Sequence, residues 1–199
     1  MMKNPERRGV VTLWTLLCLP LLMLMLLVIA EYASTWHGRV QVENAVEAAA
    51  LAAVQHWGDL GGGAANAAAA RDAGRLYALA NTVHGRQVDL DDSATAASVT
   101  WGFGTATPNG TAFDFTPAPA ATAQFAVMIQ AAVKVPRFCK SIVGNAIEDS
   151  TVVVTTAAYY DPSKKPCRPR LIRVGEVLVD PAAAAPETLT VQLLSPAGE

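Results

Sequence analysis

Residues 10–30 read VVTLWTLLCLPLLMLMLLVIA and carry no charged side chain. A helix of about 20 apolar residues spans the hydrocarbon core of a bilayer and satisfies its own backbone hydrogen bonds there. Leu, Ile and Val fill 13 of these 21 positions, and together they favour insertion by about 4 to 8 kcal/mol. The stretch therefore predicts a transmembrane helix, in spite of Pro20.

The charges on either side of this segment predict its orientation. Lys3, Arg7 and Arg8 precede it, whereas Glu31 is the first charged residue after it. Basic residues stay on the cytoplasmic side, so we expect a cytoplasmic N-terminus and an exported C-terminal part. A cleaved signal peptide remains an alternative, with Val28-Ile29-Ala30 as a cleavage site, although such peptides have a shorter apolar core.

The chain after the span is typical of a helix that continues outward. No proline occurs from Glu31 to Trp57, and alanine, the best helix former, is abundant there. The sequence then breaks at residues 58–63, which include four glycines. Small side chains permit close approach of a second helix. This packing strip consists of Ala45, Ala49, Ala52 and Ala53. It serves either a partner chain or the protein's own domain, and these two interpretations are compatible.

A second Ala-rich helix is expected over residues 64–83, with Leu76, Leu79 and Val83 as its buried stripe. The pattern then changes to Val, Thr and aromatic residues, which favour strands. The expected strands are residues 98–103, 124–135, 151–160, 171–179 and 188–194. The predicted fold class is α+β: a transmembrane helix, a long extracytoplasmic helix, a second helix, and a small, mostly antiparallel sheet in a pilin-like layout.

The sequence divides into five expected regions. They are a basic cytoplasmic flank (1–9), the span (10–30), an Ala-rich helical region (31–92), a β-rich extracytoplasmic domain (93–180), and a Pro/Ala linker with a tail or edge strand (181–199).

The chain has three cysteines, and their positions indicate whether a disulfide can form. Cys18 lies in the span, so Cys139 and Cys167 are the two on the exported side, where an oxidising environment would let them form a disulfide. Two separate buried thiols are the alternative. Cys167 lies in a basic, proline-containing stretch from Lys164 to Arg173, which is typical of a solvated loop.

Composition argues against several function classes. The net charge of −2 gives no reason to expect a nucleic-acid partner. No cysteine–histidine cluster, phosphate-binding glycine loop or nucleophile motif occurs, so we expect no metal, no cofactor and no catalytic residues. The acids Asp89, Asp91 and Asp92 lack the alternation of a calcium loop, which favours a turn.

Two stretches of the chain nevertheless resemble a known family, the TadE/TadG-like proteins of bacterial tight-adherence (Flp) pilus assembly. The first runs from Arg7-Arg8-Gly9 through Pro20 and Glu31 to the alanine-rich run that ends at Ala53. The second runs from Trp101-Gly102 to Pro162. Cleaved pseudopilin members carry a Glu five residues after the processing Gly. Counting from Gly9, that position is Trp14, so the resemblance favours the uncleaved, TadG-like branch.

The resemblance implies a structural component of a pilus assembly or secretion apparatus, not an enzyme. It also implies a bacterial inner-membrane protein whose partners are membrane lipid and other pilus-assembly or pseudopilin subunits, with a second copy of the chain as a further candidate. An anchored binding module, with its ligand site in the β-domain, is the alternative. A periplasmic hydrolase is the third class, and it would need a titratable pair in a cleft.

Overall fold

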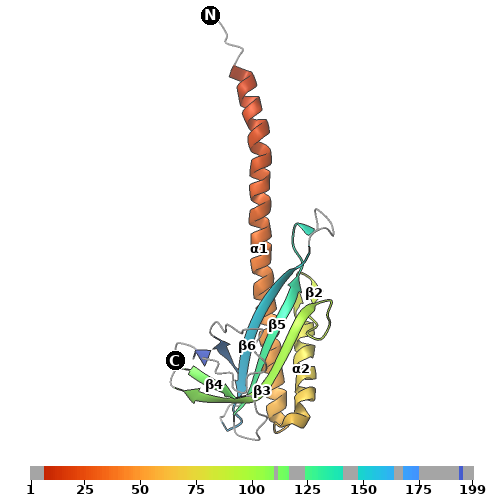
Figure 1. Cartoon of the computed structure of the whole chain (residues 1–199), viewed down its shortest axis with the longest axis vertical. Coiled ribbons are helices and arrows are strands. Elements are labelled where there is room, and N and C mark those ends of the chain that lie inside the picture. The colour runs from red at the N-terminus through yellow and green to blue at the C-terminus, as the bar shows by residue number, and fades with distance from the viewer. Residues whose placement is uncertain are drawn as a thin grey trace, which may run out of the picture. The chain divides into compact units, whose positions relative to one another are not determined.

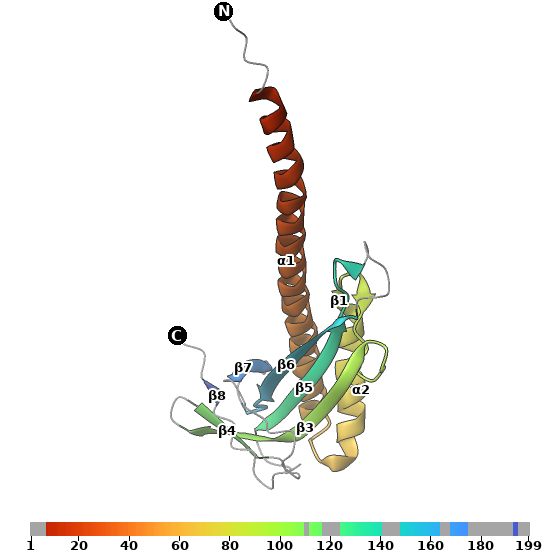
Figure 2. The same cartoon turned by 45° about the horizontal axis from the view of Figure 1, so that its top comes forward.

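The computed structural model describes residues 7–109, 112–116, 124–140, 148–163, 168–174 and 193–194. Figures 1 and 2 show two views of its helices and strands. The helices are α1 (Arg7–Asp59) and α2 (Ala67–Ala80), with a short 3-10 turn (Ala64–Asn66) between them. The strands are β1 (Thr82–Val83), β2 (Arg86–Gln87), β3 (Ala96–Asn109), β4 (Ala112–Thr116), β5 (Phe125–Val135), β6 (Ser150–Tyr160), β7 (Arg170–Val174) and β8 (Leu193–Leu194).

The chain divides into two compact units. The first consists of residues 1–37 and 136–150, and the second of residues 38–135 and 151–199. Helix α1 belongs to the first unit up to His37 and to the second from Gly38 onward. The helical residues from Gly38 onward therefore lie in the same unit as nearly all of the strand residues.

Helix α1 is continuous over 53 residues, with Pro20 inside it. This confirms that the apolar segment continues into a long helix. The helix stops where three consecutive glycines, Gly61, Gly62 and Gly63, adopt positive φ values of 79°, 72° and 87°. Residues with a Cβ rarely adopt this conformation, so the predicted glycine break is the physical end of the helix.

Helix α2 differs from the expectation in its length and in its buried face. It ends at Ala80, because residues 82–87 form a hairpin of β1 and β2 that turns at His84 and Gly85. Its buried residues are Ala70, Gly74 and Ala78, whereas Leu76 is 66 % exposed. The predicted stripe is therefore wrong at Leu76, whereas Leu79 is half-buried and Val83 is buried, the latter in β1 beyond the end of the helix. Only small residues fit where α2 meets the alanine face of α1, so the larger side chains turn outward.

The main sheet has six strands in the order β4-β3-β5-β6-β7-β8. The pairs β3–β4, β3–β5, β6–β7 and β7–β8 are antiparallel, which confirms the α+β layout. Strands β3 and β6 contain the segments expected at 98–103 and 151–160, and β5 covers all but the first residue of the segment expected at 124–135. A bulge interrupts β3 between Ala96 and Ser98. The edge strands β4 and β8 contact each other.

The larger core lies between the sheet and the two helices. Alternate residues of β5, such as Val127, Ile129 and Val133, are buried there together with Val46 and Trp57 of α1. A smaller cluster includes Phe115 of β4, Ala126 of β5 and Ile172 of β7. Because β5 contributes buried side chains to both clusters, it is the central strand of the folded domain.

Candidate membrane anchor and assembly surface

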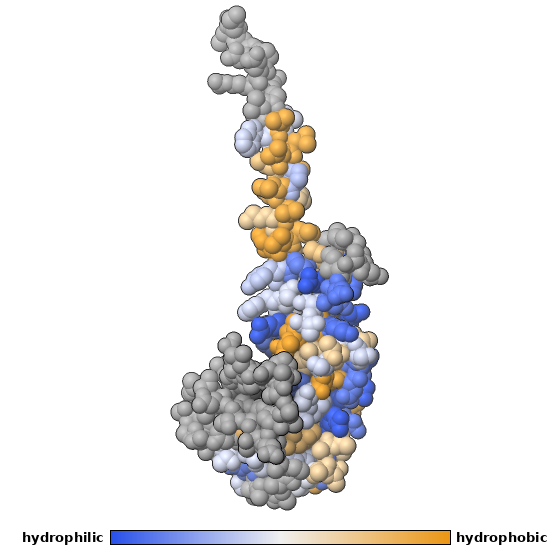
Figure 3. All heavy atoms as spheres, in the orientation of Figure 1, coloured by the Kyte–Doolittle hydropathy of each residue, from blue (hydrophilic) through white to orange (hydrophobic). Residues whose placement is uncertain are grey.

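The N-terminal part of α1 exposes its apolar side chains. An 18-residue window of this helix has a mean hydropathy of 2.7, and none of the window is buried. Figure 3 shows apolar side chains gathered toward the start of the described helix and hydrophilic ones beyond them. A core helix of a soluble protein would be covered by the rest of the chain. This helix is long and apolar enough to cross a membrane, and its apolar window has no buried residue.

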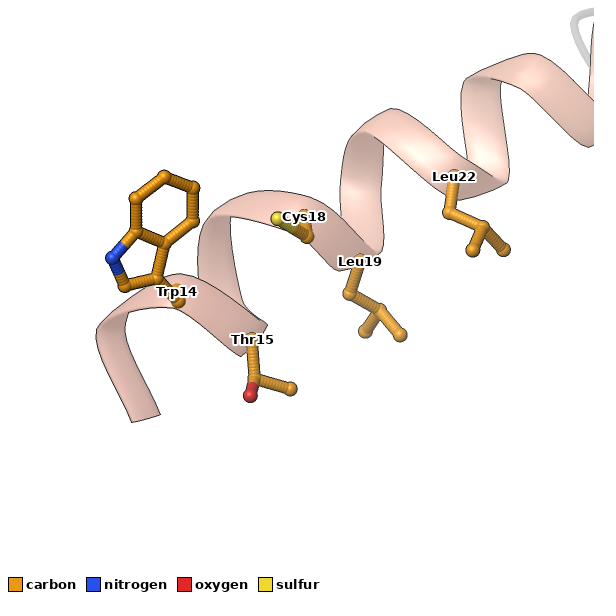
Figure 4. A pocket seen from close by; sticks show the side chains of 5 residues that line it. All are labelled: Trp14, Thr15, Cys18, Leu19 and Leu22. Atoms are coloured by element: carbon orange, nitrogen blue, oxygen red, sulfur yellow. The ribbon is translucent and has the colours of Figure 1, made fainter. Parts of the chain in front are cut away.

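One face of this segment has a shallow hollow of about 350 Å³. Figure 4 shows the side chains that line it, all from α1: Trp14, Thr15, Cys18, Leu19 and Leu22. Because a single helix forms the hollow, it is a gap between neighbouring side chains on the exposed face of the segment. It provides no polar cluster that would hold a soluble ligand.

Aromatic residues lie close to both ends of the apolar segment. Trp14, Tyr32 and Trp36 are all exposed. Tyr32 lies 18 residues after Trp14, which corresponds to about 27 Å of helix, close to the thickness of a hydrocarbon core. Tyr and Trp are enriched at membrane–water interfaces, so these positions are typical of a transmembrane helix.

The predicted packing strip lies in the interior of the protein's own fold. Ala45, Ala49 and Ala53 are fully buried, and Ala52 is half-buried. The contact at Gly74 identifies the neighbour as α2: a Cβ atom built on Gly74 would lie 3.0 Å from the Cβ of Ala53. A second helix does approach Ala49 and Ala53 closely, and it belongs to the same chain. Ala45, Ala49 and Ala53 are therefore not accessible to a partner.

The C-terminal end of α1 is fixed by aromatic contacts and hydrogen bonds. The ring of Trp57 packs edge-on against those of Phe103 and Phe125, each with a centroid separation of 5.3 Å. Its indole N–H donates to the carbonyl oxygen of Gly63 at 3.0 Å. The hydroxyl of Tyr160 donates to the Asp59 carboxylate at 2.9 Å. These contacts join the end of the helix to β3, β5 and β6.

Glu31, at the outer end of the apolar segment, receives a contact from a distant part of the chain. Its Oε2 accepts a hydrogen bond from the backbone N–H of Cys139 at 2.8 Å. The pKa of the Cys139 thiol is raised, chiefly by a hydrogen bond to Glu31 and also by burial. Sequence reasoning missed this contact. The sequence shows only that Glu31 is the first acid after the span, and nothing in it points to Cys139 as its partner.

The acidic turn after α2 is held by an ion pair that sequence reasoning also missed. The Asp89 carboxylate accepts two hydrogen bonds from Arg75, both at 2.7 Å, and Asp91 lies 3.5 Å from the same guanidinium. The hydrogen bond from Arg75 lowers the pKa of Asp89 below its usual range. Within the described residues no group of three or more acids, histidines and cysteines could hold a metal ion.

A second hollow, of about 250 Å³, lies beside this turn, between Leu90 and Val99. Acids and small residues line it, among them Asp91, Asp92, Ser93 and Ala96. The binding-module alternative predicts a deep apolar pocket in the β-domain. This hollow is small and is lined in part by acids, so it does not match the pocket that the alternative predicts.

Several predicted residues lie at or beyond the edge of the described structure. Lys3 and Cys167 fall outside the described residues, so the disulfide remains a prediction. Cys139 is a free thiol in the structure. Arg7 and Arg8 form the first turn of α1. Their role in topology remains a prediction, as do the five regional boundaries.

Comparison with known proteins supports the resemblance drawn from the sequence. A family model described as putative Flp pilus-assembly TadE/G-like matches residues 9–56. No curated protein and no solved structure matches the chain. The matched residues include the apolar segment and nearly all of the alanine-rich part of α1, whereas the stretch from Trp101 to Pro162 lies beyond them. Residues 9–56 are thus similar to the TadE/TadG-like family of Flp pilus-assembly proteins, and this similarity, together with the exposed apolar helix, supports a membrane-anchored, pilus-associated protein.

Proposed function

We propose that this protein is a structural component of a Tad/Flp-type pilus assembly or secretion apparatus. One observation carries the proposal: α1 is a single helix whose apolar N-terminal window has no buried residue, while residues from Val42 to Trp57 contribute to the core of a folded domain. This arrangement supports a domain fixed directly to a membrane-spanning helix. The family match over residues 9–56 supports a pilus-associated role.

The proposed topology places residues 1–9 in the cytoplasm, residues 10–30 in the bacterial inner membrane, and the remainder outside the cytoplasm. Lys3, Arg7 and Arg8 support this orientation through the positive-inside rule. The exported part then comprises the helical region, the β-rich domain and the C-terminal tail. It acts through contacts with other subunits, without a catalytic step.

The contact surface on α1 must lie on its exposed face, since Ala45, Ala49 and Ala53 of the alanine strip are buried. On the exported side, Trp36 and Val40 are one helical turn apart, and they are 60 % and 39 % exposed. Exposed apolar side chains on this part of α1 would contact the helix of a pilus-assembly or pseudopilin subunit, or of a second copy. The neighbouring Arg39–Glu43 ion pair, at 3.0 Å, forms part of the polar surroundings.

The test combines genetics with crosslinking in the bacterium that encodes the chain. Deletion of the gene should abolish surface pili, and the full-length chain should restore them. A photo-crosslinking residue at Val40 should then capture a pilus-assembly subunit, whereas the same residue at Gln55, also exposed on α1, should not. Normal piliation after deletion would contradict the assembly role and favour the anchored binding module.

A further inference from the structure

The turn at residues 136–140 is bound to α1 at the end of the apolar segment. Glu31 directly follows the span, and it accepts the backbone N–H of Cys139 at 2.8 Å. Both residues belong to the first unit of the chain. Adjacent Cα atoms are about 3.8 Å apart, so Phe138 must lie close to the depth of Glu31.

The side chains on this turn have the chemistry of a membrane interface. Phe138 is 43 % exposed, and Arg137 is exposed beside it. The amine of Lys140 donates instead to Asp149 at 2.6 Å, so Arg137 is the cation turned to solvent in the described part of the turn. Aromatic rings favour the interfacial layer, and a guanidinium pairs well with lipid phosphates.

The depth of the aromatic residues on α1 agrees with this placement. Tyr32 and Trp36 lie one and five residues beyond Glu31, about 2 and 8 Å further along the helix. Both are exposed. If the span occupies the hydrocarbon core, Tyr32 and Trp36 lie in the headgroup layer. The turn at 136–140 is bound to α1 at Glu31, which is at the same depth. A carboxylate at this depth is stabilised because it accepts hydrogen bonds.

We propose that the turn at Pro136–Lys140 is a second membrane contact, in which Phe138 inserts into the interfacial layer and Arg137 pairs with anionic phospholipid headgroups. Glu31 acts as the positioning residue that holds the turn at this depth. The contact limits rotation of the first unit about the axis of α1. This inference rests on the proposed placement of residues 10–30 in the bilayer.

Depth-dependent fluorescence quenching in reconstituted vesicles tests the inference. In the full-length chain the native cysteines are replaced by serine, which keeps the backbone N–H of residue 139. An environment-sensitive fluorophore is then attached at one of three sites: Phe138→Cys, Tyr32→Cys as the interface reference, or Leu76→Cys as the control. Leu76 is exposed on α2, in the second unit of the chain.

Lipids that carry a nitroxide near the headgroup should quench the fluorophores at positions 138 and 32 and leave that at position 76 unquenched. Quenching at 32 without quenching at 138 would overturn the second contact and leave the anchor intact. Absence of quenching at both 32 and 138 would overturn the placement of the span itself. The failure of the inference and that of the anchor are therefore distinguishable.

Two further variants separate the role of Glu31 from that of Arg137. Glu31→Ala should cause loss of quenching at 138 while quenching at 32 persists, and unchanged quenching at 138 would overturn the positioning role. Arg137→Gln should reduce quenching at 138 in vesicles that contain phosphatidylglycerol, but not in pure phosphatidylcholine. The matched control is Arg71→Gln, an exposed arginine on α2. If the chain that still carries Arg137 shows equal quenching at position 138 in vesicles with and without phosphatidylglycerol, the pairing of Arg137 with anionic headgroups is overturned.

Discussion

Gly74 of α2 and Ala49 of α1 lie so close that a Cβ atom built on Gly74 would be 2.7 Å from the backbone carbonyl oxygen of Ala49. Backbone atoms cannot move aside as the end of a flexible side chain can. The two helices therefore pack with almost no side-chain layer between them at this point. The alanines that resemble an assembly surface in the sequence are what makes this packing inside one chain possible.

We expect Gly74→Ala to destabilise the folded domain by about 1 to 3 kcal/mol, because the added methyl group forces α1 and α2 apart. The higher helix propensity of alanine, about 1 kcal/mol, offsets only part of this cost. Thermal unfolding of the detergent-solubilised chain measures the effect. Ala69→Leu, at an exposed position on the same helix, serves as the control and should change the melting temperature little.

Ala49→Leu tests the same packing from the other side. The side chain of Ala49 is fully buried, so leucine should lower stability and therefore the abundance of the protein in the membrane. Ala52→Leu, at a half-buried position, should have a smaller effect. A variant at Ala49 that stays abundant and stable but fails to support piliation would contradict the packing and restore the strip as an assembly surface.

Periodicity and glycine placement predicted the elements of this fold well. The span, its helical continuation and the three long strands appear where apolar, alanine-rich and β-branched patterns indicate them. The buried face of α2 was not predicted, because leucine is more hydrophobic than glycine and the sequence pattern therefore predicts that Leu76, and not Gly74, is buried. Which residues are buried depends on the surface opposite, and the surface here is a row of alanines that belongs to another element.

Long-range polar contacts were beyond the reach of the sequence for a similar reason. Glu31 and Cys139 are separated by 108 positions, and no local pattern joins them. Arg75 and Asp89 are closer in sequence, yet their pairing depends on the chain reversal that β1 and β2 produce. A charge pattern shows that such groups are present, but only the tertiary fold brings two of them together.

The hydroxyl of Tyr160 provides a separate test of how the end of α1 is attached to the sheet. Tyr160→Phe keeps the buried ring and removes the donor to Asp59, so we expect a loss of about 1 kcal/mol of stability. Tyr77→Phe is the matched control, since Tyr77 is exposed on α2. Equal melting temperatures for the two variants would show that the hydrogen bond contributes nothing to the attachment.

The Arg75–Asp89 pair predicts a pH dependence of stability. The pKa of Asp89 is lowered in the folded state by its hydrogen bond from Arg75. Its contribution is therefore fully present above the pKa of the unfolded state, near 4, and is lost as the pH falls through the lower folded-state pKa. Wild type should exceed Arg75→Ala in melting temperature at pH 7, and the difference should shrink below about pH 4.

The control for this titration is Arg71→Ala, which removes an exposed arginine from the same helix. It should parallel the wild type at every pH. If the difference between wild type and Arg75→Ala stays constant through the acidic range, the stabilisation comes from packing of the arginine stem and the ion pair has no role.

The N-terminus should be unprocessed. The apolar segment is longer than that of a signal peptide, and Trp14 stands where cleaved pseudopilins carry Glu. Intact-mass measurement of the membrane-extracted protein should show that the basic flank before Val10 is still attached to the span. A mature chain that begins at Glu31 would indicate a secreted protein, and one that begins at Val10 would indicate pilin-type processing.

The exported chain should carry a disulfide between Cys139 and Cys167, the two cysteines outside the span. Closing this loop would add about 3 to 4 kcal/mol on the chain-entropy view. In the reduced protein, Glu31 raises the pKa of the Cys139 thiol, so Cys139 should react slowly with iodoacetamide at neutral pH. Oxidation to the disulfide removes the hydrogen bond between the Cys139 thiol and Glu31. The hydrogen bond from the backbone N–H of Cys139 to Glu31 stays in place.

Peptide mapping without reductant, on protein purified from bacterial membranes, tests the bridge. A linked pair of peptides that contain Cys139 and Cys167 should appear, and it should separate on reduction. Cys18 should be alkylated in the same sample once the protein is unfolded, which provides the internal control. If all three cysteines are alkylated equally in the unfolded, non-reduced protein, the bridge is absent and the exported cysteines are two separate thiols.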